Sequence, residues 1–91
     1  MYDISLPCKA GDKVMAYLED APVKGRRLYH LSECVISRIE FSKDWTEPLF
    51  TAVCYEKAMY NTFWLSDFGK EIYSIEQYIE LLMVDSGAKK Q

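Results

Sequence analysis

The feature that most constrains the fold is a series of short apolar runs separated by turn-forming residues. Such runs occupy residues 14–18, 29–42, 49–57, 60–65 and 71–73. Polar and apolar side chains alternate along several of them, and β-branched and aromatic residues are frequent, a pattern typical of half-buried strands. The sequence therefore predicts five strands in succession.

One segment interrupts this pattern of strands, and another can be interpreted in two ways. Residues 19–27 contain proline, glycine and several charges, so we expect a long loop between the first two strands. Leu31, Val35 and Ile39 are also spaced as on one face of a helix. The β-branched residues of segment 31–39 favour a strand, and a helix stays the alternative.

The clearest local pattern is a C-terminal helix over about residues 75–85. Ser74 precedes it as an N-cap, and Gln77 stands three positions later, where a capping box places its second residue. An apolar stripe at helical spacing follows: Ile75, Tyr78, Ile79, Leu82 and Met83. We expect Gly87 to end the helix and to leave residues 88–91 as a disordered tail.

These elements predict a single domain over residues 1–87, because a chain of 91 residues leaves no room for a second core of ordinary size. The predicted fold class is α+β, mainly β. It is a five-stranded antiparallel meander, forming a strongly curved sheet or a small SH3-like barrel, with one C-terminal helix that plugs its open side. A tight turn with a positive φ at Gly69 precedes the last strand.

The composition narrows the classes of function. A net charge of −3, spread over groups of mixed sign, argues against a dedicated binder of duplex nucleic acid. No apolar stretch approaches the roughly 18 residues of a membrane span, and the N-terminus lacks the pattern of a signal peptide. We therefore expect a cytoplasmic protein without membrane contact. A domain of this size buries a modest share of its surface, which leaves a stabilising homodimer open.

Candidate catalytic and metal-binding residues do not form a recognisable set. Cys8, Cys34 and Cys54 are an odd number of cysteines without a Cys-x-x-Cys pair, so we expect no disulfide and, even with His30, no zinc site. His30 and Cys34 would lie ~13 Å apart along a strand, too far for proton transfer. We expect no enzymatic activity, no cofactor and no metal.

Both ends of the chain resemble one group of proteins. The run Trp64-Leu65-Ser66-Asp67-Phe68-Gly69-Lys70-Glu71-Ile72-Tyr73, followed by a capped helix, resembles the C-terminal signature of small proteins common in Gram-positive gut bacteria and their mobile elements. The start of the chain is similar to the same group, with Leu6-Pro7-Cys8 and then Gly11-Asp12 before a strand. The resemblance implies a compact β-rich fold encoded on a phage, plasmid or integrative element, and it brings no catalytic residues.

The remaining candidates are residues for partner binding. Trp45 stands in a polar loop beside Asp44 and Glu47, where a tryptophan either folds back on the core or is displayed to a partner. Trp64 lies in an alternating strand, and we expect it to be in the core or half-buried at its edge. The predicted loop over residues 19–27 contains a dense group of basic residues, which could bind a phosphate or an acidic surface. They complete the predicted partner-binding set: Lys24, Arg26 and Arg27.

These observations predict a non-enzymatic protein–protein interaction module, encoded on a phage or mobile element, that docks an aromatic and charged surface onto another protein. An alternative is an inhibitor of a host defence nuclease, similar to anti-CRISPR proteins, because a small acidic protein can occupy a nucleic-acid channel. A third hypothesis is a small-barrel binder of single-stranded nucleic acid that uses the basic loop and stacking aromatics.

Overall fold

Five strands, a 3₁₀ helix and one α-helix make up the protein in a computed structural model that describes residues 6–23 and 26–89. In chain order the elements are β1 (Lys13–Val23), β2 (Arg26–Glu40), β3 (Leu49–Cys54), β4 (Met59–Trp64), η1 (Leu65–Asp67), β5 (Ile72–Ser74) and α1 (Ile75–Lys89). The fold class is α+β and mainly β, as predicted. Segment 31–39 lies inside strand β2, so the helical alternative for it is wrong.

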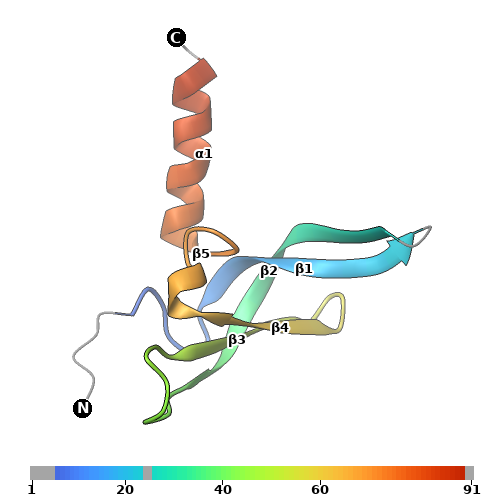
Figure 1. The fold of residues 1–91 in the computed structure, drawn as a ribbon. Helices are drawn as coiled ribbons and strands as arrows, with labels where there is room; N and C mark the ends of the chain where they lie inside the picture. The colour runs from blue at the N-terminus through green and yellow to red at the C-terminus, as the bar shows by residue number, and fades with distance from the viewer. Residues whose placement is uncertain (1–5, 24–25, 90–91) are drawn as a thin grey trace.

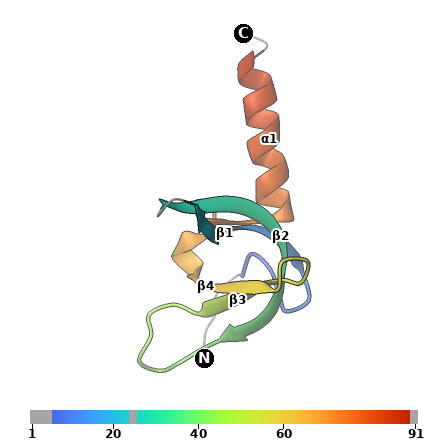
Figure 2. The ribbon, with the colours of Figure 1, turned by 90° about the vertical axis from the view of Figure 1, so that its right-hand side faces the viewer.

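The strands form one antiparallel sheet in the order β4-β3-β2-β1-β5. β1 to β4 are a meander, but β5 returns to the opposite edge and pairs with β1, which places Ile72 opposite Ala16 and buries it. The predicted five-stranded meander is therefore correct for four strands and wrong for the last. The sheet is strongly curved (Figure 1 and Figure 2) but not closed, with β4 and β5 as its two edges.

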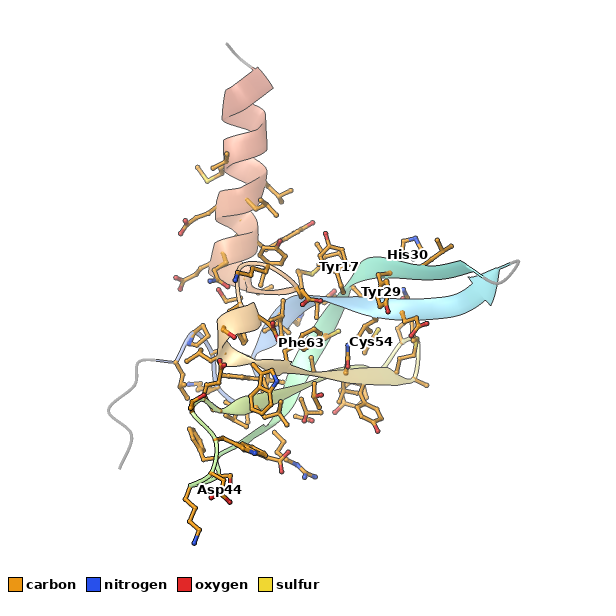
Figure 3. The ribbon with its side chains drawn as sticks, in the orientation of Figure 1. Tyr17, Tyr29, His30, Asp44, Cys54 and Phe63 are labelled. Atoms are coloured by element: carbon orange, nitrogen blue, oxygen red, sulfur yellow. The ribbon has the colours of Figure 1, made fainter. Side chains whose placement is uncertain are left out.

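Alternate side chains of the strands form the core. The inward residues of β1, β2 and β3 are buried: Val14, Ala16, Leu18, Cys34, Ile36, Phe50, Ala52 and Cys54. Figure 3 shows Cys54 and Phe63 in the space that the curved sheet encloses, whereas Tyr17 lies on the outside of the hairpin. Phe50 packs edge-on against Phe68, with 4.8 Å between the ring centroids.

A bulge in β2 breaks the regular alternation of this strand. Between Ile36 and Arg38 the pairing with β3 shifts by one residue, which leaves Ser37 as the extra residue. As a result Ile39, three positions after Ile36, also packs against the core. A strict period of two would place these two side chains on opposite faces.

The predicted loop over residues 19–27 is wrong. β1 continues to Val23 and β2 begins at Arg26, and these two residues pair with each other in a long hairpin. Pro22 fits inside β1 because the register shifts between Asp20 and Val23, at a point where a missing N–H donor does not interrupt a regular ladder. Lys24 and Gly25 lie outside the described residues.

The capping box at the start of α1 is confirmed. The backbone N–H of Gln77 donates to Oγ of Ser74 at 3.1 Å, and the backbone N–H of Ser74 donates to Oε1 of Gln77 at 3.0 Å. α1 continues past Gly87 to Lys89, four residues beyond the predicted end, since one glycine in a helix costs only about 1 kcal/mol. No helix in the described ranges is long and apolar enough to cross a membrane.

The position of α1 contradicts the prediction that it plugs the sheet. Ser74 is both the last residue of β5 and the cap of α1, so no linker lets the helix turn back over the core. α1 projects away from the sheet (Figure 1 and Figure 2), and Met83 and Val84 are each 67% exposed. The partly buried residues that pack on the core instead come from the N-terminal segment, the strands and η1 with its following turn: Leu6, Ile39, Met59, Leu65 and Phe68.

Candidate functional site

The loop between β2 and β3 is fixed to η1 by hydrogen bonds. The carboxylate of Glu47 accepts from the backbone N–H of Ser66 at 2.7 Å and from its hydroxyl at 3.2 Å. The next residue, Pro48, is fully buried, and its carbonyl accepts from the N–H of Leu65 at 3.3 Å. Within the loop, the N–H of Trp45 donates to the carbonyl of Ser42 at 3.0 Å. The loop is therefore held in one conformation against η1.

The two tryptophans of the chain meet at this place. The rings of Trp45 and Trp64 lie edge to face, with centroids 5.3 Å apart and planes at 89°. The side chains around them line a shallow hollow of about 230 Å³: Asp44, Trp45, Thr46, Glu47 and Trp64. Trp45 is half-buried. The sequence left open whether Trp45 folds back on the core or is displayed to a partner. The structure lies between the two, because Trp45 packs against the exposed Trp64 rather than into the core.

Trp64 lies on the outer face of β4, whereas the prediction placed it in the core or half-buried at the edge of the core. It is 38% exposed, and Phe63 is the residue of this pair that points inward. The sequence carried a signal for this orientation, because Thr62 and Tyr60 share the face of Trp64 in an alternating strand, and a threonine there indicates an outer face. The N–H of Trp64 donates to the carboxylate of Asp67 at 2.8 Å, which fixes the backbone where β4 enters η1.

The hollow is acidic. Asp44 is exposed at the outer end of the loop (Figure 3), and Glu47 lies on the inner side, where Ser66 holds it. No basic side chain among the described residues forms an ion pair with either carboxylate. The two tryptophans are therefore flanked by two negative charges.

The predicted partner-binding residues do not lie on one surface. Trp45, Asp44 and Glu47 come together in the loop. Lys24 lies outside the described residues, and Arg26 and Arg27 begin β2, whose other end leads into that loop. The start of β2 and the loop lie at opposite ends of the sheet (Figure 1). The side chains of Arg26 and Arg27 fall outside the described part of the structure.

The cysteines form a different environment. Cys8, Cys34 and Cys54 are buried free thiols. Burial, followed by the proximity of Cys54, raises the pKa of the Cys34 thiol to about 11, so it is protonated at neutral pH and unsuited to act as a nucleophile. His30 is exposed on the hairpin (Figure 3), whereas Cys34 is buried. Among the residues that the structure describes, no three histidine, cysteine or acidic side chains are grouped to hold a metal.

Another hollow, of about 380 Å³, lies beside β2, β3 and the following turn. Lys57 is among the polar residues that line it, with Glu33 and Glu56. Its ammonium donates to the hydroxyl of Ser32 at 3.1 Å, and that hydroxyl donates to the carbonyl of His30 at 3.3 Å. These bonds satisfy an inward-facing serine in a largely apolar strand. They explain why Ser32 can be buried.

α1 presents a second unusual surface. Its exposed apolar residues cover much of its circumference: Ile75, Ile79, Leu81, Leu82, Met83 and Val84. A helix that is apolar on most sides is normally buried. The stripe predicted from the sequence therefore exists, but in this chain it faces solvent.

Comparisons of the chain with models of protein families, with curated protein sequences and with solved structures found no match. The resemblance to small proteins of Gram-positive gut bacteria accordingly stays a prediction.

Proposed function

We propose that this protein is a non-enzymatic interaction module and that it docks a protein partner on the surface formed by Trp45 and Trp64. The observation that carries this proposal is the edge-to-face pair of half-exposed tryptophans on a loop that is hydrogen-bonded to η1. Tryptophan is among the residues most enriched at the energetic centres of protein interfaces, because it buries a large apolar area and loses little side-chain entropy.

The rigidity of the site supports the same function. Binding costs free energy when loops must be ordered, so a surface that is ordered before the partner arrives binds more tightly for the same contacts. Here Glu47 fixes the loop through Ser66, and Asp67 fixes the backbone of Trp64. Neither carboxylate bond is needed to complete the core, and both stabilise the place where the tryptophans meet.

We also propose that the fold is SH3-like. Three features support this finer description: the strand order β4-β3-β2-β1-β5, the strong curvature of the sheet, and the short η1 that joins its two edge strands. Domains of this kind bind extended peptide segments in aromatic-lined grooves. The hollow beside Trp45 and Trp64 lies next to η1, so it would receive such a segment at the junction of β4 and η1.

A quantitative pull-down from the native host tests the proposal. Tagged wild type, Trp45→Ala, Trp64→Ala and Tyr29→Ala are compared, the last being an exposed aromatic residue on the β1–β2 hairpin. A true partner is retained by wild type and Tyr29→Ala and is lost with both tryptophan variants. With the purified partner, calorimetry should give an affinity at least about tenfold lower for Trp45→Ala. Unchanged affinity in a folded Trp45→Ala protein would refute the proposal.

Inhibition of a host defence nuclease is a second candidate, and the acidic surroundings of the tryptophans favour it. Asp44 and Glu47 add negative charge where a basic nucleic-acid channel would bind. Plaque counts on defended and undefended hosts, with and without the protein, test it, and equal counts would count against it. The same carboxylates repel phosphates, which disfavours the binding of single-stranded nucleic acid at this surface.

A further inference from the structure

We infer that the hollow beside Trp45 and Trp64 binds the side chain of an arginine of the protein partner. This inference rests on the proposed function, and it adds the chemistry of the group that is recognised. Two properties of the hollow carry it: open indole faces and an unneutralised negative charge.

The ring geometry leaves aromatic surface for a ligand. In an edge-to-face pair the edge of one ring covers part of one face of the other, so each indole keeps at least one face that its neighbour does not cover. Trp64 is 38% exposed and Trp45 is half-buried, so part of this surface is accessible to solvent. Among aromatic side chains, the face of an indole attracts a cation most strongly.

The charge of the hollow selects a cation over an anion. Asp44 and Glu47 line it, and Lys43, the basic residue next to them in the sequence, is exposed but does not line it. The two carboxylates have different roles. Both oxygens of Glu47 accept hydrogen bonds from Ser66, so Glu47 contributes charge from a fixed position. Asp44 is exposed, and its carboxylate has no ion-pair partner within the described ranges, so it can bind a ligand directly.

Arginine fits this combination better than lysine. The planar guanidinium stacks on an aromatic face and at the same time donates two parallel hydrogen bonds to a carboxylate, whereas an ammonium acts as a hydrated point charge. The hollow offers a face and a carboxylate side by side, from Trp45 and from Asp44, which are adjacent in the chain. A segment that brings an arginine here would need no change in the loop, since Glu47 already holds it.

The two tryptophans make the site directly observable, because they are the only tryptophans of the chain and both line the hollow. The full chain, labelled with nitrogen-15, is titrated with the peptide acetyl-Gly-Arg-Gly-amide while the indole N–H signals are followed by NMR. A second titration uses the same peptide with citrulline, which has the shape of arginine but no charge. Parallel titrations use Asp44→Asn and the matched control Glu56→Gln, an exposed glutamate on the turn between β3 and β4.

We expect the arginine peptide to shift both indole signals at millimolar concentration and the citrulline peptide to shift neither. Asp44→Asn should weaken binding of the arginine peptide about threefold, as for the loss of an exposed ion pair, and Glu56→Gln should leave it unchanged. Equal shifts with the two peptides, or no shift with either, would overturn the inference. A folded Asp44→Asn protein with unaltered affinity would also overturn it, because the carboxylate would then have no role.

The two proposals fail in different ways. If Trp45→Ala loses the partner in the pull-down but the arginine peptide shifts no indole signal, the surface docks a partner through apolar contacts and the inference is wrong. If Trp45→Ala retains the partner with full affinity, the proposed function fails whatever the peptide does.

Discussion

Replacing Glu47 with alanine removes the carboxylate that fixes the β2–β3 loop to η1. Two hydrogen bonds are lost, to the N–H and the hydroxyl of Ser66 at 2.7 and 3.2 Å. Hydrogen bonds to a charged group contribute about 1.5–3 kcal/mol where they are shielded from water, but here the Ser66 groups become free to bind water. We therefore expect the free energy of unfolding to fall by about 1.5 kcal/mol, at the low end of that range.

Urea denaturation followed by tryptophan fluorescence measures this change, since both fluorophores lie at the affected surface. Ser66→Ala keeps the hydrogen bond from its backbone N–H to Glu47 and loses only the one from the hydroxyl. It should therefore lower the free energy of unfolding by about 0.5–1 kcal/mol. The double variant should be less destabilised than the sum of the two single variants, because they share one interaction. Glu56→Ala is the control for removing an exposed carboxylate. If Glu47→Ala and Glu56→Ala change the free energy of unfolding equally, the loop is not held by Ser66.

Three further predictions concern the helix, the last turn and the thiols. Leu82→Gln on α1 should change the free energy of unfolding by less than about 0.5 kcal/mol, whereas Ile72→Ala in the core should lower it by about 2–4 kcal/mol. If the two variants had similar urea midpoints, α1 would be packed against the sheet. Gly69→Ala should lower the free energy of unfolding by about 1–2 kcal/mol, because residue 69 has φ +92, which strains a residue with a Cβ. The added Cβ itself would meet no close contact. Thermal melts with an unchanged midpoint would contradict this prediction. Burial raises the pKa of the Cys8 and Cys34 thiols from 9.0 to about 11, so their contribution to stability is complete below pH ~9 and is lost as the pH rises toward 11. Urea midpoints measured across this pH range should fall less steeply in Cys34→Ala, and an identical slope would refute the assignment.

Local signals in the sequence predicted local structure well. Ser74 and Gln77 form the expected capping box, because a cap depends only on residues within one turn of each other. Gly69 has the expected positive φ, since the turn before β5 needs a conformation that other residues adopt at a cost. The β-branched content of β2 was also a better guide than its helical spacing.

Features that depend on pairing between distant segments were not predicted. The continuation of β1 through Pro22 requires a register shift against β2, and the return of β5 to β1 requires a partner that is distant in sequence. The apolar stripe of α1 indicated burial, yet the direct passage from β5 into α1 at Ser74 directs the helix away from the sheet. An amphipathic pattern reports which face needs a partner, and it does not identify the partner.

The candidate site was predicted in part. Trp45, Asp44 and Glu47 were expected to act together because they are neighbours in one loop, and they line one hollow. Trp64 was predicted to be in the core or half-buried from the alternation of β4, which does not by itself decide which face of the strand is inward. The role of Ser66 was not predictable, because its contact with Glu47 joins residues 19 positions apart.

Both proposals require the two tryptophans to form one surface in solution. The most direct measurement is a nuclear Overhauser experiment on the free protein that looks for cross-peaks between the ring protons of Trp45 and Trp64. With centroids 5.3 Å apart and planes at 89°, ring-edge protons of one indole lie close to the ring of the other, so we expect clear cross-peaks that weaken in Glu47→Ala. If the folded wild type gives no cross-peak between the two rings, the surface does not exist and both proposals are wrong.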